Sequence, residues 1–391
     1  MALTKTEKAP LRTRAASSIV VVTGPAKGLV GGQSRHLDLL QMLADRLGCD
    51  FVRVAIGRRA GERGGARLLL RMLGDYCHFI AVLRQAIGSG SRVVVHINSS
   101  VQYASLVRDV GFAVIARLLR PDAQLLQIHG CELRGPEDKQ PLLRALARLV
   151  AVLAGDLVVL SHAQACAIGG PALAGKVIPN AVPLQEAVKR DHRSGEGLLP
   201  LQVLYLGRLT EQKGVLLCLD AAARLRDRGV SVHLSLAGDG PLLEGLPDRI
   251  AQLGLGDHVT VLGAVPPAAV RPLLAAHDLL WAPSLTTEGQ PYSLIEALEA
   301  GLPVLTTAAG PAMREMIDSS GGALIAVTAS PESLVAATEQ LSFDPERLVC
   351  LQRLARQTAE RCHSLDGTLA QWQSAWSVVR LGTRQSEAPA A

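Results

Sequence analysis

The chain has 391 residues, of which 48% are hydrophobic and 19% are charged. This composition is typical of a globular protein and excludes a largely disordered one, and the length favours two domains over one. The 40 Lys and Arg residues exceed the 35 Asp and Glu residues by only five, so the position of the basic residues matters more than their number.

The seven cysteines are scattered and form no Cys-x-x-Cys pair. This pattern favours a reduced cytoplasmic protein without a cysteine-based metal site. The apolar run at residues 19–22 is too short for the core of a signal peptide, and no stretch approaches the roughly 20 apolar residues of a membrane-spanning helix. We expect a protein that is soluble or attached to a membrane surface.

A basic segment lies between residues 57 and 71. Its five arginines face a single Glu62 and are Arg58, Arg59, Arg63, Arg67 and Arg71. Beside three consecutive leucines, these arginines suit binding to an anionic membrane surface or to a phosphate-bearing acceptor. A solvated basic loop explains the same composition equally well, so the sequence leaves both interpretations open.

Short apolar runs alternate with helical patterns along most of the chain. Their continuous hydrophobicity is typical of parallel strands covered on both faces. The expected strands are residues 18–24, 51–57, 92–98, 124–130, 157–161 and 176–182 in the first half, and 201–207, 231–238, 259–265, 278–284, 303–308 and 322–327 in the second. Two sets of strands with intervening helices predict two doubly wound, Rossmann-like α/β domains.

The same pattern predicts the domain boundaries. We expect an N-terminal domain over residues 1–184, a polar linker at 185–200, a second domain over 201–365, and a terminal helix and tail at 366–391. Trp372 and Trp376 lie one helical turn apart. Aromatic pairs at this spacing usually serve packing, so they are expected to hold the terminal helix on a domain.

Ligands of open parallel sheets bind at the carboxyl ends of the strands. A glycine-rich loop at 23–34 follows the first strand, and its backbone suits a phosphate although it has neither the dinucleotide nor the Walker spacing. Arg208 and Lys213 follow the strand at 201–207. Two cations at one strand end stabilise a diphosphate and the charge that grows on it as a bond breaks. The alternative is a pair of solvated surface cations.

The stretch TTEGQPYSLIEALEAG at 286–301 predicts a helix that begins at Pro291 and stops at Gly301. Three residues form its apolar face: Leu294, Ile295 and Leu298. Glu296 points nearly opposite this face. Helix starts leave N–H groups unpaired, here those of Tyr292 and Ser293, which makes them suited to an anion or a sugar hydroxyl.

Glu288 and Glu296 resemble the E-x7-E pair of the retaining nucleotide-sugar glycosyltransferases of family 4. The likeness extends from about residue 19 to 341 and is strongest over 201–325, where GRLTEQKG, AGDGP, VTVLGAV and WAPS follow in the family's order. It implies the GT-B fold, in which two Rossmann-like domains face a central cleft.

The resemblance implies roles for individual residues. Glu296 is expected to bind the ribose hydroxyls, and Glu288 to face the transferred sugar near the reaction centre. Arg208 and Lys213 would hold the diphosphate leaving group. As a lone histidine at the end of a strand, His129 would usually be a core residue, but it looks like the family's first-domain histidine that approaches the donor sugar.

Further donor contacts are expected from glycines and from the start of the predicted helix. Gly31 and Gly32 would bring the N-terminal loop near the phosphates. Five positions complete the predicted donor site: Gly289, Gln290, Pro291, Tyr292 and Ser293. Since family members often have a glycine or an aromatic residue where Gln290 to Tyr292 stand, we expect the sugar to be selected there.

The implied reaction is the retaining transfer of a hexosyl-type sugar from a UDP or GDP sugar to a glycan or lipid-linked acceptor. No cofactor and no divalent metal are expected, in line with the absence of an Asp-x-Asp motif. A nucleic-acid partner is not expected. The expected setting is bacterial-type polysaccharide or glycoconjugate synthesis in the cytoplasm, with attachment to the inner membrane face as an option. The alternatives are a sugar-nucleotide epimerase or hydrolase with the same fold, and a non-catalytic nucleotide-sugar-binding subunit.

Overall fold

The computed structural model describes residues 18–27, 31–56, 66–133, 138–169, 175–187 and 200–377. Arg58, Arg59 and Arg63 of the basic segment lie outside the described residues, as does the side chain of Arg67. Arg71 is described and is half-buried.

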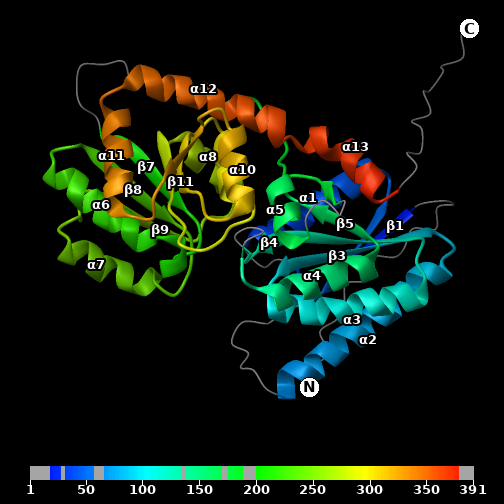
Figure 1. The fold of residues 1–391 in the computed structure, drawn as a ribbon. Helices are drawn as coiled ribbons and strands as arrows, with labels where there is room; N and C mark the ends of the chain where they lie inside the picture. The colour runs from blue at the N-terminus through cyan, green and yellow to red at the C-terminus, as the bar shows by residue number, and fades with distance from the viewer. Residues whose placement is uncertain are drawn as a thin grey trace, which may run out of the picture.

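Two six-stranded parallel sheets form the centres of the two domains (Figure 1). The first has the order β2-β1-β3-β4-β5-β6 and contains β1 (Ser18–Gly24), β2 (Asp50–Ala55), β3 (Arg92–Val101), β4 (Ala123–Cys131), β5 (Asp156–Val159) and β6 (Lys176–Val177). The second has the order β12-β11-β10-β7-β8-β9 and contains β7 (Leu201–Leu206), β8 (Val232–Ala237), β9 (Val259–Gly263), β10 (Leu279–Ala282), β11 (Val304–Thr307) and β12 (Leu324–Val327). Every strand overlaps one of the predicted strands.

The strand order reverses between β1 and β3 in the first sheet and between β7 and β10 in the second. In doubly wound sheets these switch points open a crevice at the carboxyl ends of the strands, where ligands bind. Strand β6, at one edge of the first sheet, is shorter than the strand predicted over residues 176–182. Pro179 follows Ile178 and has no N–H group, so it cannot continue the hydrogen bonds between the strands.

Helices cover both faces of each sheet (Figure 1). In the first domain α2 (Ala66–Gly88), α3 (Tyr103–Leu119) and α4 (Pro141–Ala154) cover one face, and α1 (Gly32–Arg46) and α5 (His162–Ile168) the other. In the second domain α6 (Val215–Asp227), α7 (Leu246–Gln252) and α11 (Pro331–Ser342) lie opposite α8 (Pro267–Ala275), α9 (Tyr292–Glu299) and α10 (Pro311–Ser319). Short 3-10 helices span η1 (Glu211–Lys213) and η2 (Leu243–Gly245).

The C-terminal helices return the chain to the first domain. Helix α12 (Pro345–Cys362) packs on α9, and α13 (Leu365–Ala375) packs on α1 (Figure 1). The two crossing segments pair with each other, since Val182 N donates to His363 O and Leu365 N donates to Val182 O, both at 2.9 Å.

The start of the predicted linker is bound to the second domain, because Gln185 N donates to the buried Oε1 atom of Glu299 at 3.0 Å. The residue limits of the domains stay a prediction.

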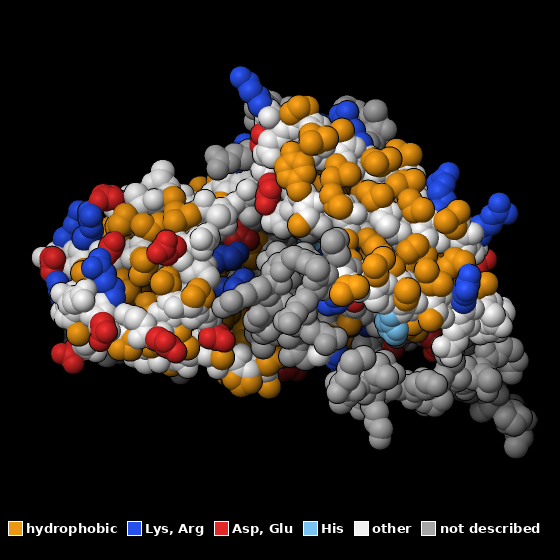
Figure 2. Space-filling view, turned by 90° about the horizontal axis from the view of Figure 1, so that it is seen from below, with side chains coloured by type: hydrophobic (Ala, Val, Ile, Leu, Met, Phe, Trp, Pro, Cys, Tyr) orange, Lys and Arg blue, Asp and Glu red, His pale blue; other side chains and the backbone are white. Residues whose placement is uncertain are grey.

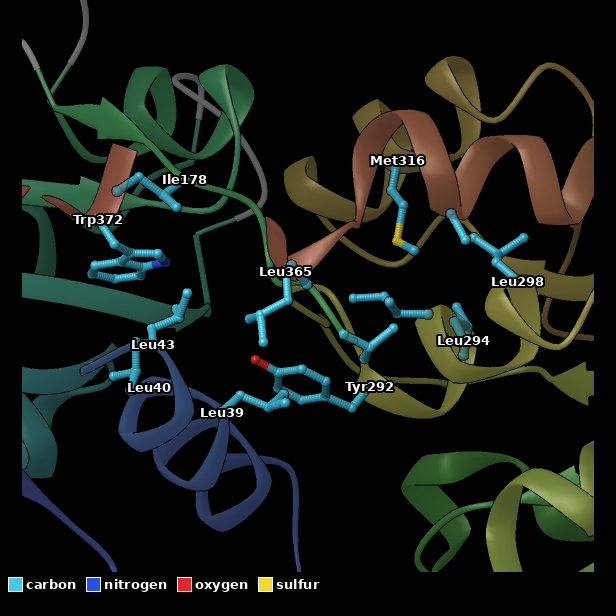
Figure 3. Close-up of a cluster of buried hydrophobic side chains, with 14 of the residues drawn as sticks. Leu39, Leu40, Leu43, Ile178, Tyr292, Leu294, Leu298, Met316, Leu365 and Trp372 are labelled. Atoms are coloured by element: carbon cyan, nitrogen blue, oxygen red, sulfur yellow. The ribbon is translucent and has the colours of Figure 1, made fainter. Parts of the chain in front are cut away.

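One hydrophobic cluster continues through both domains. It joins Leu39, Leu40 and Leu43 of α1 to Leu294 and Leu298 of α9, with residues of α13 between them. Figure 3 shows the ring of Tyr292 beside Leu39 and Leu365 at this junction. The burial of this apolar surface stabilises the packing of the domains against each other.

A second junction links α10 to α5. The carboxylate of Glu315 accepts hydrogen bonds from the N–H groups of His162 at 3.1 Å and Ala163 at 2.7 Å. Ser161 Oγ accepts a third, from Gln164 N at 3.0 Å. These are the first N–H groups of α5, and a carboxylate at a helix N-terminus is favourable. The second domain therefore caps a helix of the first.

Trp372 and Trp376 pack α13 onto the first domain, as predicted for packing residues. Both are buried, at 3% and 0% exposure, and the ring of Trp372 stacks on His96 with 5.5 Å between centroids. Trp376 Nε1 donates to His96 Nδ1 at 3.3 Å. The structure thus shows which domain receives the terminal helix.

Beneath α13, two buried histidines share one acceptor. His36 Nε2 and His96 Nε2 lie 2.8 and 3.0 Å from Gln127 Oε1. A carbonyl oxygen only accepts, so each histidine carries its proton on Nε2 and uses Nδ1 as an acceptor. His36 Nδ1 accepts a hydrogen bond from the hydroxyl of Tyr292 at 2.7 Å, and His96 Nδ1 accepts one from the indole N–H of Trp376. Burial lowers the pKa of His36 to about 4 and that of His96 to about 3, so both are neutral at pH 7.

These lowered pKa values predict that the protein loses stability in mild acid. The unfolded chain binds protons at these histidines near pH 6.5 and the folded chain only near pH 4 or below, so stability falls as pH falls through this window. For His36 the loss is roughly 3 kcal/mol by pH 4. Urea midpoints from pH 7.5 to 4.5 should fall less steeply in His96→Gln than in the wild type. His78→Gln, at an exposed position of α2, serves as the control, and equal slopes in all three proteins would contradict the prediction.

Candidate functional site

The switch point of the second sheet brings Glu288 and Lys213 together. Glu288 follows β10, and Lys213 ends η1, which follows β7. Lys213 Nζ forms an ion pair with Glu288 Oε1, and Ser284 Oγ donates to the same oxygen at 2.7 Å. The Glu288 side chain is 16% exposed and that of Lys213 34%. Two residues predicted from separate motifs therefore share one strand edge.

Arg208 lies at the same edge and is exposed. In the described part of the chain its guanidinium has no hydrogen-bond partner, while its carbonyl accepts from Tyr205 Oη at 2.7 Å. The loop after β8 supports this backbone closely. A Cβ at Gly238 would overlap the carbonyl oxygen of Gly207, and one at Gly240 would overlap that of Leu209. The two glycines of AGDGP are thus needed for the loop to pack beneath Arg208.

Helix α9 presents Glu296 on the side opposite its buried apolar face, as predicted. Pro291 is the N-cap, one residue before the helix, because its ψ of 132° is extended; Gly301 ends the helix with a φ of 70°. Glu296 Oε1 accepts from Arg35 Nε of α1 at 3.0 Å. Burial raises the pKa of Glu296, and the charge and hydrogen bond of Arg35 oppose that rise.

His129 lies near the carboxyl end of β4, two residues before the strand ends at Cys131. Its Nε2 lies 2.9 Å from Asn98 Oδ1, and Asn98 Nδ2 donates to Thr23 O at 2.8 Å. Because the Asn98 amide is oriented by Thr23, His129 must donate from Nε2, which leaves its Nδ1 as an acceptor. Burial lowers the pKa of His129 well below its usual value, so the ring is neutral. It packs edge-to-face on His36 with centroids 4.1 Å apart.

The loop that carries Glu288 rests on the end of β4. A Cβ at Gly289 would overlap the carbonyl oxygen of His129 and lie 3.1 Å from Leu160 Cδ1. Only glycine permits this approach. The residue that follows Glu288 therefore contacts the backbone of His129 across the two domains.

The side chains of Gln290 and Tyr292 are engaged with the first domain. Gln290 Oε1 accepts from Asn180 N at 2.9 Å, and Gln290 Nε2 donates to Leu160 O at 3.0 Å. The Tyr292 hydroxyl bonds to His36. Pro291 and Ser293 are half-buried, and among the described residues nothing pairs with the N–H groups of Tyr292 and Ser293. Because the side chains of Gln290 and Tyr292 bind the first domain, only the backbone of this segment is left to contact a sugar. Selection of the sugar by residues 290–292 stays a prediction.

Gly31 and Gly32 begin α1 and are exposed. Gly31 has a φ of 151°, which favours glycine, and a Cβ on either residue would meet no atom of the described residues within 4 Å. The described residues thus leave the start of α1 uncovered, and its approach to a phosphate stays a prediction. Among the residues described, no three His, Cys, Asp or Glu side chains are grouped as a metal site requires.

Sequence reasoning missed Arg35, His36, Asn98 and Gln127. The signal was polar residues inside or beside apolar runs: HIN ends the predicted strand at 92–98, QIH ends the one at 124–130, and RH follows the glycine loop. Buried polar groups need partners, so two such positions near neighbouring strand ends and a third at the start of the helix that follows the first strand indicate a network.

Residues 189–358 match the family model of glycosyl transferases group 1. This region contains Arg208, Lys213, Glu288 and Glu296. The chain is 34% identical over 113 residues to WcaL of Escherichia coli K12, which is named as a colanic acid biosynthesis glycosyltransferase, over 28% of each chain. It is 30% identical over 166 residues to the amylovoran biosynthesis glycosyltransferase AmsK of Erwinia amylovora, over 41% of this chain and 40% of AmsK. The matches thus span less than half the length of these curated relatives.

Solved structures are similar over a larger part of the chain. Anabaena HepE in complex with UDP-glucose superposes with a TM-score of 0.69, covering 92% of this chain and 100% of that chain at 19% identity. This likeness, with the two parallel six-stranded sheets, confirms the expected GT-B fold.

The close contact at Gly289 predicts that Gly289→Ala destabilises the protein. The added methyl group must push the Glu288 loop away from His129, and overpacking of this kind costs typically 1–3 kcal/mol. The denaturation midpoint should fall accordingly. Gly256→Ala is the matched control, since a Cβ there meets no atom of the part of the chain that the structure describes within 4 Å. Equal midpoints for the two variants would show that the loop does not rest on β4 in solution.

Proposed function

We propose that the protein is a retaining, metal-independent glycosyltransferase of family 4 that transfers a sugar from a nucleoside diphosphate sugar to a glycan or lipid-linked acceptor. One observation carries the proposal: Glu288, paired with Lys213, directly precedes Gly289, and Gly289 packs on the carbonyl oxygen of His129 in the other domain. The family match over 189–358 and the polysaccharide-synthesis names of WcaL and AmsK support it. HepE, whose complex contains UDP-glucose, supports a UDP sugar as the first donor to test.

The donor would lie along α9. Glu296 is the acceptor for ribose hydroxyls, and the unpaired N–H groups at the helix start face the diphosphate. Arg208 and Lys213 bind the same diphosphate from the end of β7. Glu288, held by Lys213 and Ser284, accepts hydrogen bonds from the sugar. His129 Nδ1 is a second acceptor for a sugar hydroxyl.

In the proposed transfer the bond between the anomeric carbon and the diphosphate oxygen breaks, and the acceptor oxygen bonds to that carbon on the same face. The acceptor proton passes to the departing phosphate. Negative charge grows on the diphosphate in the transition state, and Arg208, Lys213 and the helix start stabilise it. Neutral His129 orients the sugar and takes no proton, since its pKa lies well below the usual value.

Two carboxylate variants test the separate roles of the glutamates. Glu288→Gln should lower the transfer rate about 100-fold or more with nucleotide affinity retained, because a sugar contact that strengthens in the transition state is lost. Glu296→Ala should weaken nucleotide binding about 10-fold or more, because hydrogen bonds to a charged acceptor are lost. A thermal-shift screen first finds the nucleotide that best stabilises the protein, and calorimetry with it measures the nucleotide affinity of both variants. A transfer assay with the corresponding sugar donor measures the rate. Glu244→Gln, at an exposed position, is the control.

Each outcome separates the alternatives. An unchanged nucleotide affinity in Glu296→Ala would refute the proposal that Glu296 binds the ribose hydroxyls. Donor breakdown to free sugar or to an epimer, independent of any acceptor, would identify a hydrolase or epimerase. Nucleotide-sugar binding without any turnover would identify a non-catalytic subunit.

The Arg35–Glu296 pair predicts a pH effect on nucleotide affinity. Without Arg35 the pKa of the partly buried Glu296 rises further, so the carboxylate is protonated at a higher pH and accepts fewer hydrogen bonds. In Arg35→Gln the affinity should therefore begin to fall at a higher pH than in the wild type as pH is lowered from 8 to 5. Arg35→Lys should restore part of the profile. Arg46→Gln, at the other end of α1, is the control, and superimposable profiles for Arg35→Gln and wild type would refute this role.

A further inference from the structure

The outer surface of α2, α3 and α4 is apolar. Fourteen large hydrophobic side chains are exposed in the described residues, and ten of them lie on these three helices. Six are more than half exposed: Leu70, Leu73, Val107, Leu118, Leu142 and Val152, at 69, 59, 56, 75, 68 and 66%. Figure 2 shows hydrophobic side chains gathered over the first domain, whereas charged side chains of both signs are mixed over the second. We call this surface the α2–α4 face.

The three helices that form the α2–α4 face are also cationic. The three helices contain seven arginines and two aspartates, a net charge of +5. That equals the formal net charge of the whole chain, so the rest of the protein is balanced. Of the aspartates, Asp109 is fully buried beside Arg108, and Asp75 is half-buried. Arg84 and Arg117 are exposed, so α2 and α3 each carry an exposed positive charge as well as exposed apolar side chains.

We infer that the α2–α4 face docks onto an anionic lipid bilayer. Contiguous exposed apolar surface indicates an interaction site, and apolar side chains combined with arginines suit the boundary between acyl chains and anionic headgroups. A second copy of the chain fits less well, because two faces of the same positive charge repel each other. No helix among the described residues is long and apolar enough to cross a bilayer.

The inference extends the prediction from the basic segment at 57–71. That segment leads into α2, so its arginines adjoin the α2–α4 face in the chain. The apolar part of the face comes mainly from α3 and α4, which the sequence did not single out. The inference does not rest on the proposed glycosyl transfer.

The test is co-sedimentation of the full chain with vesicles of phosphatidylcholine, with and without phosphatidylglycerol. Binding should require the anionic lipid and decline with added salt. The triple variant Leu118→Gln, Leu142→Gln and Val152→Gln should lower the vesicle partition coefficient about tenfold or more, because three apolar side chains no longer enter the interface. The matched control is Leu262→Gln with Phe343→Gln, two exposed apolar residues of the second domain. Circular dichroism should show unchanged folding in both variants.

Charge is tested separately. Arg84→Gln with Arg117→Gln should weaken binding and reduce its salt dependence, whereas Arg228→Gln with Arg249→Gln on the second domain should not. Absence of sedimentation at low salt, or equal binding to neutral vesicles, would overturn the inference. So would binding that survives the triple variant but is lost in Arg58→Gln, Arg59→Gln and Arg63→Gln, since the basic segment alone would then be responsible. Self-association that the triple variant abolishes would identify a second copy as the occupant.

Discussion

The arrangement of the two domains depends on a buried chain of hydrogen bonds centred on Gln127. Its carbonyl oxygen accepts from His36 and His96, and the other nitrogens of these rings accept from Tyr292 and Trp376. These four hydrogen bonds have one consistent set of directions, which requires both histidines to be neutral. Since unpaired buried polar groups are costly, α9 of the second domain and the C-terminal end of α13 are held to the first domain together.

The candidate site follows from that junction. Arg35 precedes His36 on α1, and Glu296 follows Tyr292 by one turn on α9, so the contact between His36 and Tyr292 brings Arg35 to Glu296. At the other end of the same segment, Gly289 places the Glu288 loop against the end of β4. The residues expected to hold a nucleotide sugar are thus positioned by contacts between domains, in addition to those within the second domain.

Much of the second domain's site was predictable because its signals are local. Strands bounded by glycines, two cations after one strand, and a carboxylate opposite an apolar helix face can each be read within about 15 residues. The contacts of Arg35 and Gln290 could not be read in this way, because their partners lie 261 and 110 residues away. An arginine in a first helical turn or a glutamine before a helix has many possible partners, and only packing selects one.

The sequence by itself determined the twelve strands, the GT-B class, the position of Glu296 on its helix and the strand edge shared by Arg208 and Lys213. The GT-B class follows from the resemblance of the motifs to a known family, and the other features follow from hydrophobic period, turn residues and motif spacing, which act over short distances along the chain. Only the tertiary structure decided that α13 returns to the first domain, that Gln290 and Tyr292 bind that domain through their side chains, and that α2, α3 and α4 share one apolar, cationic face. Those outcomes depend on which surfaces meet and which remain uncovered, and this is set by the burial of apolar area and the pairing of polar groups across the whole molecule.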